Sequence, residues 1–502
     1  MRKFSVIFTS FIFLFGFGFS GTIIDSVWGT ALWPQVGHTI SYGPSVDAIL
    51  IALHSFEHSI DVHSAHGNLS YWIHDEHIYN LEFGIPQWTI NTLASTYPYI
   101  GFTTHTTKMV AQRCFGWFNG NWEDPVNLGP DTAHASLNIP LQLQDGNILF
   151  ITLTFDSIIY RTRTPDLQTE VSHGTIARAC YFWGADLNNG TAYVFYFDTL
   201  LNIYYRTTAD GINWTPPQNW TVVWPNPYLN NIIGWTQMAI TDAGSPLLVF
   251  DNWNGDEYNS GIYPFHSKVY VSYASGLPCV EVSSTFGAPD TECVYPTIAT
   301  GGNLIAVLYC MPRNNESGSL NWWDFYVVWS SDGGQTWGTP INCTQSLINR
   351  PGLPQLAKRI DTLRYRVYYI YAIDMVRNID PLWNVWISGD YDPMYIYFDY
   401  APYAGVEEGE MLKVKDKRLK LMILPSVVRD NAEIQFAIPV RQGIRLDLYD
   451  IIGRNLKTIE EGTLEPGLYS CNLNLSNLTS GIYFLILEGE RESKTEKLLI
   501  VR

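Results

Sequence analysis

The sequence predicts an all-β protein, with a six- or seven-bladed β-propeller followed by an Ig-like β-sandwich. A sequence repeat of short strands and turns recurs between residues 21 and 405 at intervals of about 40 to 60 residues, close to the length of one four-stranded propeller blade. Tyr, Trp, Val, Ile and Thr dominate the predicted strands, and no long amphipathic helix is evident. Residues 421–502 contain seven further strand-like runs separated by turns, which is the pattern of a small sandwich.

The N-terminus has the pattern of a secretory signal peptide, predicted over residues 1–20. A basic start, Met1–Lys3, precedes an almost unbroken apolar run, Phe4–Phe15, and small residues stand at Gly18 and Ser20. The apolar run is short for a membrane span, and no later segment is long and apolar enough to cross a bilayer. We therefore expect an exported protein that is cleaved after Ser20 and has no membrane span.

This sequence repeat defines the predicted propeller, residues 21–405. Each copy has a small or Pro-containing start, an apolar second strand, an aromatic third strand and a polar hairpin, and a closed ring of such copies leaves no exposed sheet edge. We count seven copies, with six blades and an N-terminal extension as the alternative. The copies begin near Gly43, Thr96, His134, Arg178, Trp235, Val294 and Gly352. The second strands are predicted at residues 147–155, 191–197, 247–251, 304–310 and 365–371, and the third strands at residues 158–162, 203–207, 268–273, 324–329 and 384–387.

One hairpin has a sharper pattern than the others, with Ser330, Asp332, Gly334 and Trp337 in the spacing Ser-x-Asp-x-Gly-x-x-Trp. The hydroxyl and the carboxylate can satisfy backbone groups of the turn, and glycine tolerates a positive φ. Residues 208–214 are a degraded copy, and residues 119–122 keep only the turn and the aromatic residue. The motif resembles the Asp-box of sialidase-like propellers. The resemblance implies a structural role for these four residues, on the face away from the active site.

The same resemblance raises the alternative of an exo-acting glycoside hydrolase of sialidase-like fold. Sialidases hold the carboxylate of their substrate with three arginines, whose guanidinium forks suit that task. No Lys or Arg occurs between residues 4 and 107, so the first copy lacks the first of these arginines. Asp47 is a candidate acid/base residue or an ordinary residue at a strand edge. The arginines near predicted strand starts are Arg178, Arg313 and Arg350.

A cluster of histidines occupies residues 38–77. His54, Glu57 and His58 match the His-x-x-Glu-His signature of inverted zinc peptidases, which requires both imidazoles on one face of a helix. These residues follow a strand-like run, Val46–Leu53, so the cluster is predicted to consist of solvated loop histidines. We predict no metal site and no cofactor. The cluster contains His38, His54, His58, His63, His66, His74 and His77.

Charge and composition divide the chain in two. Residues 21–405 hold 14 basic and 33 acidic residues, whereas residues 406–502 hold 14 basic and 15 acidic residues. All 18 tryptophans lie at or before Trp386. The acidic first part disfavours nucleic acid and anionic membranes as partners. The charged stretch 406–420 is predicted to be a linker.

Seven scattered cysteines are too few for a disulfide scaffold in a chain of this length. Two pairs, Cys279 with Cys293 and Cys310 with Cys343, could each close a short loop. Buried free thiols are the state we expect for most of them.

The runs after the linker, residues 421–502, resemble the type A C-terminal sorting domain of the type IX (Por) secretion system. The chain departs from that family at Pro425–Val427, where the usual sequence is Pro-Asn-Pro. An ordinary Ig-like accessory domain is the alternative. The resemblance implies contact with the type IX secretion machinery and six motif residues, Tyr449, Gly453, Arg454, Gly467, Gly481 and Tyr483. The predicted strands are Lys420–Pro425, Ala432–Pro439, Ile444–Ile452, Asn455–Gly462, Gly467–Asn474, Gly481–Glu488 and Glu492–Val501.

These patterns together predict a secreted or cell-surface, non-catalytic propeller that binds a polysaccharide or a protein ligand. The alternatives are the glycoside hydrolase and a purely structural envelope protein. Aromatic clusters at Trp322-Trp323 and at Trp383 and Trp386 could stack on sugar rings, although such residues more often pack between blades.

Overall fold

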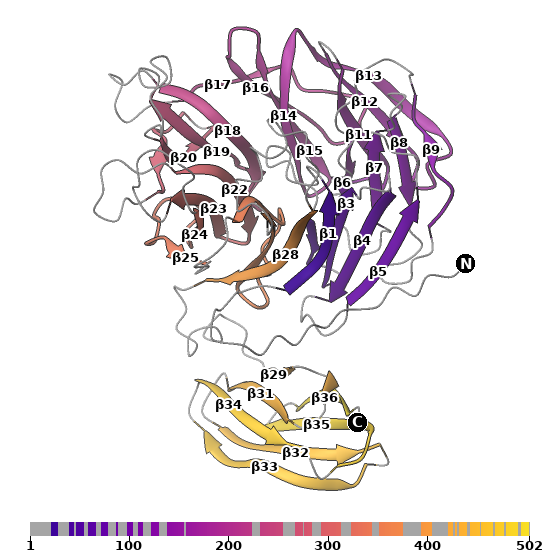
Figure 1. Cartoon of the computed structure of the whole chain (residues 1–502), viewed down its shortest axis with the longest axis vertical. Coiled ribbons are helices and arrows are strands. Elements are labelled where there is room, and N and C mark those ends of the chain that lie inside the picture. The colour runs from indigo at the N-terminus through magenta and orange to yellow at the C-terminus, as the bar shows by residue number, and fades with distance from the viewer. Residues whose placement is uncertain are drawn as a thin grey trace.

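The computed structural model of the protein consists of strands and turns, and the part of the chain that it describes contains no helix that could cross a membrane (Figure 1). The described residues are 22–28, 40–44, 47–54, 59–66, 72–78, 87–88, 98–103, 109–113, 122–129, 138–154, 157–222, 231–254, 267–274, 276–283, 293–312, 323–343, 351–374, 393–403, 420–424, 427–428, 431–438, 442–451, 453–464, 467–475, 478–489 and 493–500. The predicted signal peptide and nearly all of the predicted linker lie outside them.

Residues 22–402 form seven four-stranded antiparallel sheets, an arrangement like that of a β-propeller (Figure 1). In six of the sheets four consecutive strands pair in chain order, and the first strands of successive sheets contact one another, so they line the middle of the ring. The strands of these sheets are β2 (Ile40–Gly43), β3 (Ala48–His54), β4 (Ser59–His66), β5 (Trp72–Ile78); β6 (Gln87–Trp88), β7 (Tyr99–Thr103), β8 (Met109–Arg113), β9 (Val126–Asn127); β10 (Asn138–Gln142), β11 (Ile148–Leu153), β12 (Ser157–Arg163), β13 (Glu170–Arg178); β14 (Cys180–Asn188), β15 (Thr191–Asp198), β16 (Ile203–Thr208), β17 (Gln218–Trp220); β18 (Asn231–Ile240), β19 (Pro246–Asn254), β20 (Ser267–Tyr273), β21 (Val280–Glu281); β22 (Val294–Gly301), β23 (Leu304–Pro312), β24 (Trp323–Ser330) and β25 (Ile341–Asn342).

The seventh sheet joins the two ends of this segment. Its strands are β26 (Pro351–Leu356), β27 (Arg366–Asp374), β28 (Pro393–Pro402) and β1 (Thr22–Trp28), and β1 pairs antiparallel with β28. A last sheet built from both ends closes a ring of sheets, because β1 covers the edge that β28 would otherwise expose. The sequence pattern did not predict β1, which is a single strand outside the sequence repeat.

The predicted second strands are all confirmed as β11, β15, β19, β23 and β27, and four of the five predicted third strands as β12, β16, β20 and β24. The fifth predicted strand, residues 384–387, lies outside the described residues, and the described strand that pairs with β27 is β28, further along the chain. The copy predicted to begin near Thr96 also starts earlier. Tyr99 opens a second strand, β7, and the first strand β6 has only two residues, too few to produce a periodic pattern.

Apolar side chains from neighbouring sheets fill the spaces between them. Val249 and Val271 of one sheet and Ile305 and Val307 of the next belong to one buried cluster. Cys279, Cys293 and Cys310 are buried and Cys343 is half-buried, and none of the four forms a disulfide, so neither of the two possible pairs is present and the expectation of buried thiols is confirmed for three of them. Burial raises the pKa of the Cys279 thiol to about 11, which keeps it protonated and unreactive.

A buried ion pair occupies the middle of the ring near the turns that join first and second strands. The Arg359 guanidinium, just after β26, donates to both carboxylate oxygens of Asp186 in β14, at 2.8 and 3.2 Å. Asp186 also accepts the Ile240 N–H of β18 at 2.8 Å. Beside it, the fully buried Lys358 ammonium donates to Gln237 Oε1 at 3.2 Å and to the Met238 carbonyl at 2.7 Å. Because these contacts reach from the seventh sheet to the fourth and fifth, the chain crosses the ring's axis here.

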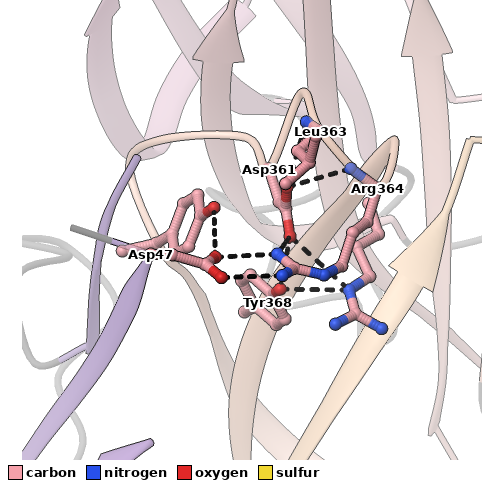
Figure 2. A network of polar contacts seen from close by, with 7 residues as sticks. Asp47, Asp361, Leu363, Arg364 and Tyr368 are labelled. Atoms are coloured by element: carbon pink, nitrogen blue, oxygen red, sulfur yellow. Dashed lines mark hydrogen bonds and ion pairs between the residues drawn. The ribbon is translucent and has the colours of Figure 1, made fainter. Parts of the chain in front are cut away.

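A second ion pair ties the first sheet to the seventh (Figure 2). The Arg364 guanidinium forms two 2.7 Å hydrogen bonds with the Asp47 carboxylate, in the turn between β2 and β3, and a third of 2.8 Å with Asp361. Tyr42 donates to Asp47 at 3.0 Å, and Tyr368 donates to Asp361 at 2.6 Å. Asp47, a candidate acid/base residue from the sequence, is therefore part of the ring's closure.

The C-terminal part is a pair of sheets around one core. The three-stranded sheet has the order β29–β31–β34 and the five-stranded sheet the order β30–β36–β35–β32–β33. Ile434 and Leu473 from the first sheet and Leu446 and Leu485 from the second belong to one buried cluster. All seven predicted strands are confirmed with small shifts at their ends, and β30 was missed. The strands are β29 (Lys420–Leu424), β30 (Val427–Val428), β31 (Asn431–Ile438), β32 (Gln442–Asp450), β33 (Asn455–Leu464), β34 (Gly467–Asn474), β35 (Gly481–Gly489) and β36 (Ser493–Ile500).

Replacing Asp186 by alanine is expected to lower the free energy of unfolding by about 3–5 kcal/mol, because Arg359 would remain buried without its counter-charge. The double variant Asp186→Leu/Arg359→Met removes both charges and should recover a large part of that loss. Denaturant unfolding of the three proteins measures both effects. A single variant as stable as the unmodified protein would contradict this role for the ion pair.

Candidate functional site

Four successive sheets interrupt the pairing of their first and second strands at the same place. In each sheet the β-bulge lies at the start of the first strand, at the opposite end from the turn that leads into the second strand. β-Bulges of this kind redirect side chains and occur often beside binding and active sites. The register shifts lie between Phe182 and Gly184, Ile233 and Thr236, Val294 and Thr297, and Gly352 and Gln355.

The sequence explains why the ladder breaks at these positions. Gly184, Gly234, Pro296 and Gly352 each lie at or within a bulge. Glycine weakens a strand because it has no side chain to pack, and proline cannot donate a ladder hydrogen bond. These residues were a signal that the sequence reasoning passed over, since an isolated Gly or Pro inside a strand pattern favours a bulge.

One buried carboxylate, that of Asp251 in β19, satisfies two of the released backbone amides. Its Oδ1 accepts the Trp235 N–H at 2.6 Å, and its Oδ2 accepts the Tyr295 N–H at 3.1 Å. Asp251 has no exposed surface. A bulged N–H group has left the ladder and needs another acceptor when it is buried. Asp251 therefore fixes the bulged segments of two neighbouring sheets to each other.

The side chains above this carboxylate form an aromatic pair. The rings of Trp235 and Tyr295 meet edge to face, with centroids 5.2 Å apart and planes at 68°, and both side chains are half-buried. Tyr295 has a φ of 56°, a left-handed conformation that is rare for an aromatic residue and costs about 1–3 kcal/mol. Each residue thus keeps part of its surface exposed at the bulged end, and Tyr295 also packs against the apolar cluster between the sixth and seventh sheets.

The predicted turn motif lies at the other end, between β24 and β25. Ser330 Oγ donates to Asp332 Oδ1 and accepts the Gly334 N–H, both at 2.8 Å, and Asp332 accepts the Thr336 N–H and hydroxyl at 2.9 and 2.6 Å. Burial alone would raise the pKa of Asp332, but these hydrogen bonds outweigh it and hold that pKa at about 2. Gly334 has a φ of 94°, and Trp337 is half-buried against the core between two sheets. The Ser330 hydroxyl and the Asp332 carboxylate both have internal partners, and the assignment to the Asp-box family stays a prediction.

The degraded copy has the same internal bonding, and a third turn repeats it. Asp210 accepts two backbone N–H groups after Thr208, and Asp166 receives the Thr164 hydroxyl at 2.5 Å. In each of the three turns a backbone carbonyl accepts a hydroxyl from the preceding sheet. The pairs are Tyr273 with Gly334, Thr162 with Gly211, and Tyr99 with Pro165. The turns therefore hold neighbouring sheets together, and the sequence reasoning missed the third of them because it has no Gly or Trp.

The remaining catalytic and metal-binding candidates are not brought together in the described residues. Arg178 is exposed at the end of β13, whereas Arg313, Arg350 and the aromatic residues Trp322, Trp383 and Trp386 lie outside the residues that the structure describes. Trp323 opens β24.

The prediction of loop histidines was wrong for five of the seven. His54 lies in β3, His63 and His66 lie in β4, and His74 and His77 lie in β5; His63 is only 4% exposed. The alternation of apolar and polar residues continues through these strands, so they pair in a sheet. His38, Glu57 and His58 lie outside the described residues, which contain no cluster of three possible metal ligands.

The predicted sorting-domain residues occupy turns and strand ends of the C-terminal sheets. Arg454 Nε donates to Asp450 Oδ2 at 2.7 Å across the turn after β32, where Gly453 has a φ of 80°. Tyr449 donates to Asp447 at 3.2 Å. Gly467 and Gly481 open β34 and β35, and the Tyr483 hydroxyl, from the buried side chain, donates to the Thr479 carbonyl at 2.9 Å. Arg454 remains largely exposed, with 72% of its side chain open to solvent.

Comparison with known proteins identifies the C-terminal part. Residues 423–501 match the family described as the secretion system C-terminal sorting domain. This domain indicates export by the type IX secretion system, to the cell surface or to the medium, and contact with that machinery. No curated protein matches the chain.

Solved structures with a similar fold include polysaccharide lyases. An ulvan lyase described as a new polysaccharide lyase family, PL25, is 11% identical with a TM-score of 0.51, over 76% of this chain and 95% of the lyase. Its complex with -[GlcA(1-4)Rha3S]- has a TM-score of 0.50 at 11% identity, over 75% and 96% of the two chains. At these identities the likeness concerns the fold alone. PorZ, a surface component of the type IX secretion system of Porphyromonas gingivalis, has a TM-score of 0.38 at 12% identity, over 93% of this chain and 60% of PorZ.

Replacing Asp332 by alanine should lower stability by about 1–3 kcal/mol, because the turn loses the acceptor of its N–H and hydroxyl groups. The pKa of Asp332 is about 2 in the folded protein, below the ordinary value near 4. Its stabilisation is therefore complete above about pH 5 and is lost as the pH falls towards 2. The difference in melting temperature between the two proteins should shrink over that range. An unchanged difference from pH 6 to pH 2 would contradict the proposed role of the carboxylate.

Proposed function

We propose that this protein is an exported seven-bladed β-propeller that binds a polysaccharide or protein ligand, without catalysis, at the bulged end of its ring. In this proposal residues 1–20 are the signal peptide, 21–405 the propeller, 406–420 the linker and 421–502 an Ig-like sorting sandwich. The observation that carries the proposal is the set of four successive bulges at one end of the inner strands, where Asp251 fixes a half-exposed aromatic pair.

Seven blades are supported by the seven four-stranded sheets and by the seventh sheet's composition. Six sheets use four consecutive strands, and the seventh takes three strands from the end of the segment and β1 from its start. A ring that closes in this way is the usual solution for a long repeating β-chain, because it removes the exposed edges.

The two ends of the ring differ in what their polar groups do. At the turn end, the Asp186–Arg359 and Asp47–Arg364 ion pairs hold sheets together. At the bulged end, the carboxylate of Asp251 is used for backbone support, and Trp235 and Tyr295 each keep part of their surface exposed. Ligand sites combine apolar walls with a few fixed polar groups, which favours the bulged end as the binding face.

The alternative function is an exo-acting glycoside hydrolase. Such enzymes use two opposed carboxylates that are free to exchange protons with substrate or water. Asp47, Asp186 and Asp251 each accept hydrogen bonds from an arginine or from backbone amides, which favours structural roles for them. A purely structural envelope protein is the third possibility, and ligand binding separates it from the other two.

Deletion of residues 421–502 should retain the protein in the periplasm of a host that has type IX secretion. Fusion of the same residues to a periplasmic carrier should bring the carrier to the cell surface. Cell fractionation and surface labelling measure both outcomes, and a tail of the same length with a scrambled order is the control. Surface display of the truncated protein would contradict the role of the tail.

The purified protein should not hydrolyse fluorogenic sialosides between pH 4 and pH 8. A sialidase that loses one bidentate carboxylate partner typically loses about 2–5 kcal/mol of binding energy, or roughly 30- to 4,000-fold in rate. Turnover that disappears in Arg178→Ala would establish the hydrolase as the function and remove the non-catalytic proposal.

A further inference from the structure

We propose that Trp235 and Tyr295 form a stacking platform for the sugar rings of a neutral polysaccharide. The inference rests on the proposed binding function and names its ligand class and its contact residues.

The position of the two side chains favours a ligand contact. Both residues belong to bulges at the start of inner strands, β18 and β22, and both are half-buried. The other end of β18 lies about 15 Å away at Ile240, where Asp186 and Arg359 cross the ring. A ligand at the ring's axis therefore meets the aromatic pair from one side only, and the opposite side is occupied by the chain.

The backbone under the platform is unusually well fixed. Both amides are held by the two oxygens of a single buried carboxylate, so the two backbone segments cannot move apart without breaking a charge-assisted hydrogen bond. Tyr295 also keeps a left-handed φ of 56°, which an aromatic residue adopts at a cost. Strained residues persist where the surroundings hold them, and they concentrate at binding sites. Rigid aromatic anchors lose little entropy when a ligand binds.

The chemistry of the rings selects the kind of ligand. The face of an aromatic ring is electron-rich, and it attracts the C–H groups that one face of a sugar ring presents. The edge-to-face arrangement of Trp235 and Tyr295 offers two such faces in different directions, suited to successive sugar units of a bent chain.

The acidic charge of the protein favours neutral polysaccharides over anionic ones. Residues 21–405 carry 33 acidic and only 14 basic residues, so uronate or sulfate groups would be repelled. The arginines near the axis, Arg359 and Arg364, are both paired with aspartates at the turn end and are not offered to an anion. A neutral chain meets neither obstacle.

Affinity electrophoresis of the mature protein in gels containing single polysaccharides tests the inference. The neutral probes are a β-1,3-glucan, dextran, xylan and galactomannan, and the anionic probes are alginate and a sulfated galactan. We expect retardation by at least one neutral chain and by neither anionic chain. Trp235→Ala should weaken that binding by about 10- to 100-fold, the loss usual for a central aromatic contact.

Two variants of Tyr295 separate the ligand contact from packing. Asn tolerates the left-handed conformation, so Tyr295→Asn adds no backbone strain; it should lower the melting temperature only through lost packing against the cluster between the sixth and seventh sheets, and lose affinity as Trp235→Ala does. Tyr295→Phe keeps the ring and should keep the affinity. Trp337→Ala removes a half-buried tryptophan from the turn end and is the matched control. It should lower the melting temperature and leave the affinity unchanged.

The possible outcomes test the stacking platform and the proposed binding function separately. Neutral-polysaccharide binding that Trp235→Ala and Tyr295→Asn leave intact would overturn the platform and keep the binding function. Retardation by the anionic chains alone would overturn the ligand class. If no polysaccharide retards the protein, the inference fails, and the proposed function stands only if a protein ligand is found. If Trp235→Ala does not fold, Tyr295→Asn alone decides.

Discussion

The ring depends on the ion pair between Asp186 and Arg359 at its axis. The sheets pack side by side, and the first strands of successive sheets contact one another around the axis. Arg359 reaches across this space, and Asp186 accepts both its guanidinium and the Ile240 amide. Two charges removed from water cost several kcal/mol each unless they find each other and further hydrogen bonds, and both conditions are met. These contacts therefore join the fourth, fifth and seventh sheets to one another at the axis.

Fixing one end of the inner strands leaves the other end able to depart from regular pairing. The turn end carries two ion pairs and three turns whose backbone carbonyls accept hydroxyl groups from the preceding sheets. The opposite end carries four bulges and a strained tyrosine. In the proposed function, this division assigns stability to one face and ligand binding to the other. Local strain of a few kcal/mol is tolerated only where the remaining structure is firmly held.

The sequence predicted what repeats and missed what occurs once. Second strands in five copies and third strands in four of those follow an apolar or aromatic alternation, so their places were clear from the pattern. β1 and β6 carry no such repeat, and β28 lies after a long segment that broke the expected spacing. The turn at Ser330 was found because its hydrogen bonds are local, whereas Asp251 supports residues 16 and 44 positions away in the chain. The positions of Gly234 and Pro296 hinted at the bulges, but no local pattern connects them to one carboxylate.

The pairing of β1 with β28 has a consequence for how the molecule folds during export. Its two strands come from opposite ends of the propeller segment, so the contact with the longest sequence separation is also the one that completes the ring. Contacts of this kind form late, because the chain must first give up the entropy of the whole intervening loop. Without β28 and β1 paired, the first six sheets form only an open arc with an uncovered edge. The strand that completes this arc is the last one before the sorting domain in the chain, so closure requires the whole segment that precedes that domain.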